Sequence, residues 1–227
     1  MAQQAIVLLS GGLDSATALA IAKSQGYECT ALSFSYGQRS TIETEAARHV
    51  CQSMQIKRHQ IIHLDLAELG GSALTDSDLA IPHSLAKENE IPITYVPARN
   101  TIFLSIALAW AEVLQAWHIF IGANNVDYSN YPDCRPEYIA AFEKMANLAT
   151  KATVEGQTIR IETPLMNLGK ADIIRRGVSL GVNYSLTISC YHADTQGRAC
   201  KKCSSCQQRF QGFIQANIPD PTRYQSN

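Results

Sequence analysis

Ser10-Gly11-Gly12-Leu13-Asp14-Ser15 joins an apolar run, residues 5–9, to residues 16–22, whose apolar positions repeat with the period of a helix. This pattern predicts a turn from a buried strand into a helix. Glycines let the backbone approach a ligand closely, and the start of a helix offers unpaired N–H groups at the positive end of its dipole. The stretch is therefore predicted to bind an anion such as a phosphate. Its spacing differs from the GxxxxGK[ST] and GxGxxG nucleotide-binding motifs.

Apolar segments of strand type alternate with segments of helical periodicity on both sides of this turn. Such alternation with short connections predicts an α/β fold with a doubly wound open parallel sheet and right-handed crossovers. Asn100 is expected to cap the helix that it begins. The predicted strands are residues 5–9, 28–34, 61–64, 119–121 and 158–161, and the predicted helices are residues 16–22, 42–54, 100–117, 137–149 and 171–180.

Four polar motifs are expected at the carboxyl ends of strands: SGGLDS at 10–15, SFSYGQR at 33–39, PARN at 97–100 and GANN at 122–125. Ligands of open parallel sheets bind beyond the carboxyl ends of the strands, so these motifs are expected to share one site. Residues 70–92 have few periodic apolar positions, and a loop of that length is expected to form a lid.

Composition favours a small-molecule enzyme over a nucleic-acid-binding protein, because the 227 residues carry a net charge of only −1. No charged-then-apolar secretory start precedes the turn, so a cytoplasmic location is expected. The most apolar stretch, residues 102–121, is interrupted by Glu112, Gln115 and His118. It is therefore predicted to form a buried helix and a strand, not a membrane span.

Four of the seven cysteines are clustered with the spacing C-x9-C-x2-C-x2-C, at Cys190, Cys200, Cys203 and Cys206. Four thiolates at this spacing favour one structural zinc per chain. An iron–sulfur cluster remains an alternative, and the nearby basic residues 198, 201 and 202 would also suit a nucleic-acid-binding knuckle. Of the other cysteines, Cys29 and Cys51 are expected in the core, whereas Cys134 could be structural or have a lowered pKa.

The SGGxDS motif resembles the signature of the PP-loop ATP pyrophosphatases. Further motifs narrow the resemblance to the 7-cyano-7-deazaguanine synthase family over residues 6–209, with the string DYSNYPDCR at 127–135 the most specific. Two positions depart from the family pattern, in which glycine is expected: Ala98 in PARN and Lys201 after the second clustered cysteine. The other matching motifs are FSYGQR at 34–39, VPARN at 96–100, PL at 164–165 with Lys170, and SCY at 189–191.

The resemblance implies an adenine nucleotide α-hydrolase-like domain, residues 1–185, and a small zinc-binding segment, residues 186–227, packed on the same domain. It implies a ligase that adenylates 7-carboxy-7-deazaguanine with ATP, lets ammonia displace AMP to give an amide, and adenylates the amide so that AMP leaves and a nitrile remains. ATP, zinc and Mg²⁺ are the implied cofactors, with Asp14 or its neighbours serving Mg²⁺. A homodimer without direct contact to nucleic acid or membrane is expected.

Site residues follow from the same resemblance. Asp14, Lys170 and Arg209 are expected to be catalytic, although a solvated basic residue is the alternative for Lys170 and Arg209. Asp14 is expected to be exposed, so that its loss would change stability little. The residues expected to bind ATP are Leu8, Leu9, Ser10, Gly11, Gly12, Leu13, Asp14, Ser15, Ala16, Thr17, Ala18, Phe34 and Arg99, and those expected to bind the deazaguanine are Asp127, Tyr131, Asp133 and Arg135.

Alternative roles exist for several of these residues. Asp133 could cap a helix instead of accepting the N–H groups of the guanine-like ring, and Tyr131 could merely pack. Three other functions compete with the leading one: a tRNA-thiolating enzyme, an amidating synthetase, and a non-catalytic zinc-ribbon module. The near-zero charge argues against tRNA, the length argues against an attached glutaminase domain, and a zinc ribbon would leave the SGGLDS motif without a role.

Overall fold

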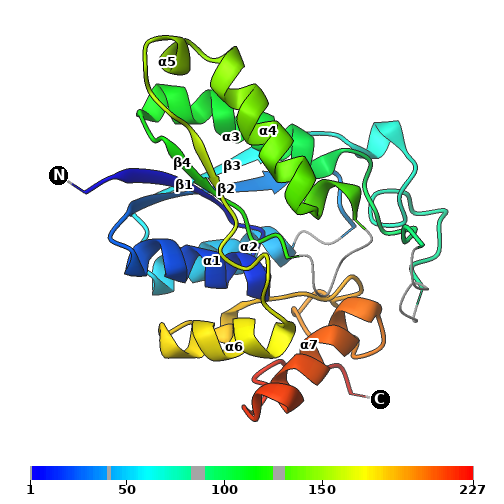
Figure 1. Cartoon of the computed structure of the whole chain (residues 1–227). Coiled ribbons are helices and arrows are strands. Elements are labelled where there is room, and N and C mark those ends of the chain that lie inside the picture. The colour runs from blue at the N-terminus through cyan, green and yellow to red at the C-terminus, as the bar shows by residue number, and fades with distance from the viewer. Residues whose placement is uncertain (1, 40–41, 83–89, 125–130, 227) are drawn as a thin grey trace.

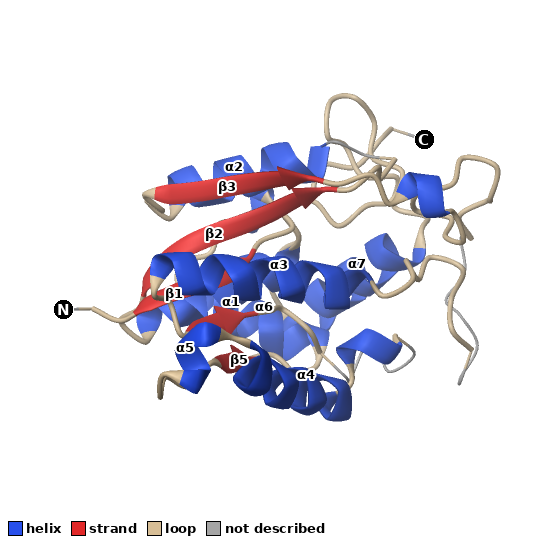
Figure 2. Cartoon of the chain, turned by 90° about the horizontal axis from the view of Figure 1, so that it is seen from above, coloured by secondary structure: helices blue, strands red, loops and turns tan. Residues whose placement is uncertain are grey.

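The computed structural model describes residues 2–39, 42–82, 90–124 and 131–226. Its centre is a parallel five-stranded sheet in the order β3-β2-β1-β4-β5. The carboxyl ends of the strands point to the edge where the loops gather (Figure 2). The strands are β1 (Gln4–Leu8), β2 (Glu28–Ser35), β3 (Arg58–His63), β4 (His118–Phe120) and β5 (Arg160–Glu162).

Helices cover both faces of the sheet, which confirms the doubly wound α/β prediction (Figure 1). One face carries α3 (Arg99–Leu114), α4 (Pro136–Ala149) and the short α5 (Lys151–Val154). The other face carries α1 (Leu13–Ser24) and α2 (Ile42–Ser53), with α6 (Lys170–Ser179) and α7 (Ser204–Ala216) lying beyond α1. Three 3₁₀ turns cover Ala67–Leu69, Pro132–Cys134 and Tyr184–Leu186.

The central strand β1 is apolar on both sides because helices cover both faces. Ile6 and Leu8 belong to the core on the α3 side, whereas Ala5 and Val7 belong to the core on the α1 side. This alternation follows from the two-residue period of a strand. Residues 10–15 therefore leave the middle of the sheet at its carboxyl edge, where the first strand feeds directly into α1.

Helix α3 differs from its prediction at both ends. It runs from Arg99 to Leu114 between two left-handed residues, Ala98 (φ 53°) and Gln115 (φ 54°). The prediction that Asn100 caps this helix is wrong, because Asn100 lies inside the first turn. Its Nδ2 donates instead to the backbone oxygen of Asp133 at 3.1 Å, which ties α3 to the 3₁₀ turn that precedes α4.

The described part of the predicted lid, residues 70–82 and 90–92, is attached to the core. Ala73 and Ile81 are buried, and the backbone N–H of Ala73 donates to the carbonyl of Ile93 at 2.9 Å. Only Leu74 of these residues lines the pocket described below. Residues 83–89 lie outside the described part of the chain, so a lid stays a prediction.

Helix α7 had no counterpart among the predicted elements. It packs against α6, and its Phe213 is buried in the same core as Leu19 of α1. Cys29 and Cys51 are also buried in this core, as predicted. None of the helices in the described part of the chain is long and apolar enough to cross a membrane.

Candidate active site

A cavity of about 250 Å³ opens at the carboxyl edge of the sheet. Its walls come from the predicted phosphate loop, from the ends of β2 and β4, from the start of α3 and from α7. All four motifs expected to meet here contribute at least two lining residues, and PARN contributes Arg99 and Asn100. The predicted ATP-site residues that line the cavity are Leu8, Leu9, Ser10, Gly12, Leu13, Asp14, Ser15, Phe34 and Arg99.

Hydroxyl groups hold the phosphate loop in a tight turn. Ser15 Oγ accepts from the backbone N–H of Ser10 at 3.2 Å and donates to the carbonyl of Gly12 at 3.1 Å. Gly11 has φ 84°, and a Cβ at this position would lie 2.2 Å from the backbone oxygen of Glu43. Only glycine fits there, since any side chain would displace the start of α2 from the loop.

Asp14 and Lys170 form an ion pair in which Nζ lies 2.8 Å from both carboxylate oxygens. The Lys170 side chain is only 8% exposed and that of Asp14 is 24% exposed. The expectation of an exposed Asp14 whose loss would cost little is therefore wrong. Removing this carboxylate would take an ion-pair contact of 2.8 Å from a buried ammonium, which is costly. The solvated alternative for Lys170 is also excluded, because the side chain is buried.

Helix α7 provides the space that Lys170 occupies. A Cβ on Gly212 would lie 2.4 Å from Lys170 Cγ, so the close approach of α6 and α7 requires glycine here. On the other side of the loop, a Cβ on Gly122 after β4 would lie 3.0 Å from the backbone of Asp14. Two glycines far apart in the sequence thus allow the Asp14–Lys170 pair to form at the helix start.

Arg209 of α7 also lines the cavity, and it is 3% exposed. Each of its nitrogens has a partner: Nε donates to Thr222 Oγ1 at 2.6 Å, Nη1 to Thr187 Oγ1 at 2.8 Å and Nη2 to the carbonyl of Tyr184 at 2.8 Å. Burial lowers the pKa of Arg209, while Asp220 at 3.7 Å raises it. The solvated alternative is again excluded, and the guanidinium is held rigidly at the wall.

Arg99 is the cation on the opposite wall, at the first residue of α3. Burial alone would lower its pKa, but Tyr36, Tyr131 and Asp133 raise it above its ordinary value. Its guanidinium carbon lies 6.0 Å from the centre of the Tyr36 ring. The cavity therefore presents cations from three helices, α3, α6 and α7, to a ligand that carries negative charge.

The predicted deazaguanine-binding residues do not all reach the cavity. Tyr131 lines it and exchanges a hydrogen bond with Thr94 Oγ1 at 2.9 Å. Asp133 is buried outside the lining, where its Oδ2 accepts from the backbone N–H of Asn100 at 2.9 Å. That bond caps the first turn of α3, which is the alternative role foreseen for Asp133. Arg135 is exposed at the N-cap of α4, and Asp127 lies outside the described residues.

Four of the predicted ATP-site residues lie behind the loop and not in the cavity lining: Gly11, Ala16, Thr17 and Ala18. Thr17 Oγ1 donates to the carbonyl of Leu13 at 2.8 Å and contacts the hydroxyl of Tyr184 at 2.7 Å. Burial raises the pKa of Tyr184 to about 12, so its hydroxyl stays protonated. These residues hold the loop and the first turn of α1 in place from the core side.

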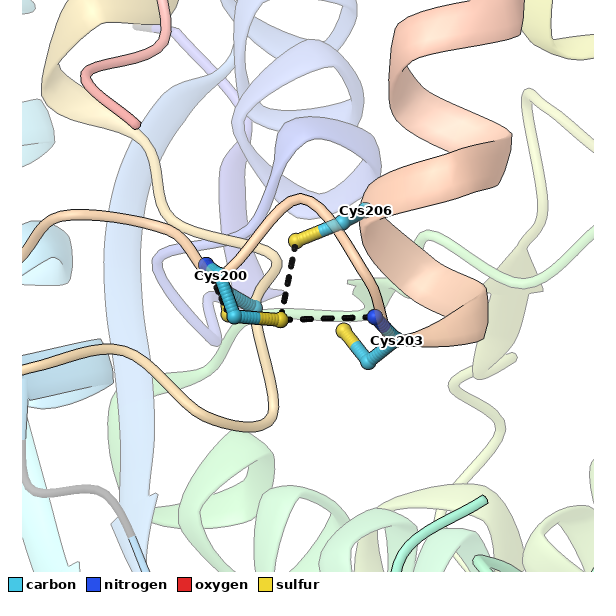
Figure 3. Close-up of side chains that lie close together, drawn as sticks. Cys200, Cys203 and Cys206 are labelled. Atoms are coloured by element: carbon cyan, nitrogen blue, oxygen red, sulfur yellow. Dashed lines mark hydrogen bonds between the residues drawn. The ribbon is translucent and has the colours of Figure 1, made fainter. Parts of the chain in front are cut away.

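The four clustered cysteines converge as a metal site requires, with ligand atoms within 4.8 Å of one another. Tetrahedral zinc with bonds of about 2.3 Å places its sulfur ligands about 3.8 Å apart. The Sγ atoms of Cys200 and Cys206 are 4.0 Å apart. Figure 3 shows the sulfur atoms of Cys203 and Cys206 directed toward that of Cys200. The residues present therefore fit a four-coordinate ion with no open position.

Backbone N–H groups point at these sulfur atoms and would stabilise thiolates. Cys190 Sγ accepts from Cys200 N at 3.1 Å, and Cys200 Sγ accepts from Cys203 N at 3.3 Å. Lys201, which lies between Cys200 and Cys203, has φ 61°, and its Nζ lies 4.9 Å from the centre of the Phe210 ring. Both positions at which family glycine was expected, Ala98 and Lys201, are thus left-handed, which explains the preference for glycine.

Cys134 lines the cavity, but it does not have the lowered pKa that a reactive thiol needs. Burial and the neighbouring Asp133 raise its pKa to about 11. Its sulfur accepts a hydrogen bond from Asn100 Nδ2 at 3.3 Å. Cys134 is therefore a structural residue of the wall.

Several residues that line the cavity were not predicted from the sequence. Glu43 of α2 was hidden in an ordinary amphipathic helix, where an acidic residue in the first turn carries no special signal. Phe103 stacks on Phe34 with ring centres 3.9 Å apart, and its helical periodicity had indicated only burial. Ser205 lies on the unpredicted α7, whose spacing of Cys206, Phe210 and Phe213 was a detectable signal.

Comparison with known proteins agrees with this geometry. A sequence model described as "Queuosine biosynthesis protein QueC" matches residues 4–217. A 7-cyano-7-deazaguanine synthase of Pseudomonas fluorescens is 61% identical over 98% of both chains. A synthase of the same name from Methylococcus capsulatus is 61% identical over 98% of this chain and 99% of its own.

Solved structures share the fold at much lower identity. A 4-thiouridine synthetase in complex with RNA and bound ATP has a TM-score of 0.51 at 17% identity, covering 98% of this chain and 47% of its own. NMN synthetase from Francisella tularensis has a TM-score of 0.50 at 17% identity, covering 95% of this chain and 84% of its own. The fold and the matches across nearly the whole length agree with the resemblance in the motifs: this chain belongs to the queuosine biosynthesis protein QueC family.

Proposed function

We propose that this protein converts 7-carboxy-7-deazaguanine and ammonia to 7-cyano-7-deazaguanine, cleaving ATP to AMP and pyrophosphate at each of two stages. The relatives with this name match nearly the whole chain, and the observation that carries the chemistry is the buried Asp14–Lys170 pair in a phosphate loop at a helix start. A carboxylate oxygen is a poor leaving group, and transfer of AMP onto it makes departure possible.

The loop residues Ser10, Gly12 and Ser15 bind the pyrophosphate part of ATP in this proposal, next to the positive end of the α1 dipole. Lys170 and Arg209 face the charge that develops as the bond between the α-phosphate and pyrophosphate breaks. Asp14 orients Lys170 and is the candidate ligand for a Mg²⁺ ion that accompanies ATP. Phe34 and Phe103 offer an apolar wall for the adenine ring.

The deazaguanine is held on the other side of the cavity in this proposal. Tyr131 stacks on the heterocycle, and Asp127 is the candidate acceptor for its N1–H and 2-amino groups. Asp133 keeps a supporting role, because its carboxylate is occupied by the start of α3. Arg135 is proposed to act only from the rim, since it is exposed.

Zinc in the four-cysteine site supports this cavity without taking part in the chemistry. The residues that follow Thr187 toward the first clustered cysteine line the cavity, and the backbone N–H of Ile188 donates to the carbonyl of Gly11 at 3.0 Å. Residues 186–227 are accordingly proposed as a zinc-binding segment packed on the domain of residues 1–185. A cytoplasmic homodimer that takes ammonia as its nitrogen source completes the proposal.

Mass spectrometry of the product tests this function. The protein is incubated with 7-carboxy-7-deazaguanine, ATP, Mg²⁺ and ammonium, and the nucleotide products are separated. The expected products are the nitrile and AMP. Accumulation of the amide without nitrile would indicate an amidating synthetase, and formation of ADP in place of AMP would refute the proposal.

A further inference from the structure

Two carboxylates line the cavity in the described part of the chain, Asp14 and Glu43. Asp14 is occupied, because both of its oxygens accept from Lys170 at 2.8 Å. Glu43 is different, since no hydrogen bond or ion pair from the described residues reaches its carboxylate. A half-buried carboxylate that faces a cavity, with no hydrogen bond or ion pair from the described residues, is available to a ligand.

Glu43 is held beside the phosphate loop by its own backbone. Its carbonyl oxygen packs where a Cβ of Gly11 would be, so the first turn of α2 and the loop touch. The charged and titratable groups that act on the carboxylate are Arg99 from α3 and Tyr36 after β2. Burial raises the pKa of Glu43 to about 7, while Arg99 lowers it. A group with such a pKa can take up a proton at neutral pH.

The proposed reaction needs a base at nitrogen in both stages. When ammonia attacks the acyl adenylate, its nitrogen becomes positively charged and must lose a proton before AMP leaves, or ammonia itself is expelled. When the amide oxygen then attacks the second ATP, pyrophosphate leaves and the nitrogen carries two protons as C=NH₂⁺. Both protons are lost as the C–O bond breaks, AMP departs with the oxygen, and the third C–N bond forms.

We propose that Glu43 is the general base that removes these nitrogen-bound protons. No other described residue of the lining is as well suited. Histidine does not occur among the lining residues, Asp14 is neutralised by Lys170, and burial raises the pKa of the Cys134 thiol to about 11. The remaining titratable groups of the lining are arginines and phenols: Tyr36, Arg99, Tyr131, Tyr191 and Arg209. This assignment rests on the proposed function, because it concerns steps of that reaction.

Glu43→Gln separates this role from ATP chemistry. Hydroxylamine is largely unprotonated at neutral pH, and its nitrogen becomes acidic enough after attack to lose its proton to water. Trapping the acyl adenylate as a hydroxamate therefore reports adenylation with little need for a base. Glu43→Gln should form hydroxamate within about twofold of the parent rate, while its conversion of amide to nitrile falls by roughly 10²–10⁴-fold. Glu45→Gln is the matched control, because Glu45 lies in the same helical turn but is exposed and should leave both rates unchanged.

Chemical rescue and pH dependence complete the test. The parent rate of nitrile formation from the amide should rise with pH up to about 7, where the Glu43 carboxylate becomes deprotonated, and this rise should be absent in Glu43→Gln. Added formate should restore nitrile formation to Glu43→Ala in a concentration-dependent way. Circular dichroism and zinc content establish that each variant is folded.

Two results would overturn the assignment. Nitrile formation by Glu43→Gln at the parent rate would show that the base lies elsewhere. Equal loss of hydroxamate and nitrile, together with a raised requirement for Mg²⁺, would make Glu43 a metal ligand instead. If the parent itself formed no nitrile, the proposed function would fail, and the role of Glu43 with it.

Discussion

The phosphate loop, residues 10–15, and the cysteine segment, residues 190–206, both lead into the first turn of a helix but hold their polar groups differently. In the loop, the charge of Asp14 is balanced by Lys170, which is 156 positions away along the chain. In the cysteine segment, the donors are backbone N–H groups within a few residues, such as Cys203 N to Cys200 Sγ at 3.3 Å. The loop depends on the rest of the fold, whereas the segment brings four sulfur atoms together as a metal ion would require.

Because of this difference, substitutions in the two regions should have different effects on catalysis and on folding. A substitution in the loop should affect catalysis first, and it should affect stability through the loss of an ion-pair contact to a buried side chain. A substitution in the cysteine segment should affect folding first, because the binding energy of a structural metal is folding energy. The hydrogen bond from Ile188 to Gly11 joins the two regions, so damage to the segment should then reach the loop.

Cys203→Ser should have the largest effect on stability. Zinc content should fall from about one per chain to none, and α7 should become sensitive to protease, with a loss of roughly 5 kcal/mol or more. Elemental analysis and limited proteolysis measure these effects. Cys134→Ser, which replaces a wall cysteine outside the cluster, is the control and should retain zinc. Iron with visible absorbance in the parent would contradict a zinc site.

Asp14→Ala should come next, with AMP formation abolished and stability lowered by about 3 kcal/mol, since the buried ammonium of Lys170 loses the carboxylate that lies 2.8 Å away. Adding Lys170→Met removes that charge and should restore most of the stability but none of the activity. Urea denaturation of the two variants measures the difference. Equal stability of Asp14→Ala and the parent would contradict the account of the pair.

Lys170→Ala should cost less stability than Asp14→Ala, because the carboxylate left behind is 24% exposed and can be hydrated. Its rate of AMP formation in a single turnover should nevertheless fall by roughly 10²-fold or more, with little change in deazaguanine binding. Supplying the amide should not rescue it, since the second stage again transfers AMP. If Lys170→Ala turned over both the acid and the amide at the parent rate, the role proposed for Lys170 would have to belong to Arg209 or Mg²⁺.

Substitutions at the left-handed residues Ala98 and Lys201 should give the smallest effects. Ala98→Gly should stabilise the protein by about 0.5–1 kcal/mol, because glycine adopts positive φ without a steric penalty. Lys201→Gly should be nearly neutral, because the same gain is offset by loss of the contacts of one ammonium with the rings of Phe210 and Tyr224, at 4.9 and 5.4 Å, together worth about 0.5–1 kcal/mol. Thermal melts of both variants, with activity as a control, measure this. If Lys201→Gly raised stability as much as Ala98→Gly does, the ring contacts of Lys201 would contribute nothing to stability.

The sequence was most informative where structure is local. The alternation of apolar segments predicted all five strands and the parallel sheet, and CxxC spacing predicted that four sulfur atoms converge. Contacts between distant segments could not be predicted, since periodicity gives no distance between elements. The burial of the Asp14–Lys170 pair depends on the fit of Lys170 against Gly212 of α7, a helix that was not among the predicted elements.

The candidate site shows the same limit. The motifs identified most of the cavity wall, but the occupied carboxylate of Asp133 and the available one of Glu43 depend on which backbone groups approach them. Asp133 lies in the family motif and meets the start of α3, whereas Glu43 lies outside the predicted site and faces the cavity. The residue types in a motif do not show which side chain binds a ligand and which one only holds the surrounding structure in place.

Isotope labelling of the substrate tests the central claim, that AMP is transferred to the acid and again to the amide. Both carboxylate oxygens of 7-carboxy-7-deazaguanine are labelled with ¹⁸O, and the nucleotides formed with ammonium and ATP are analysed by mass spectrometry. Both oxygens should appear in AMP, one in each of the two molecules formed per nitrile. Unlabelled AMP, or ¹⁸O in inorganic phosphate, would contradict the account.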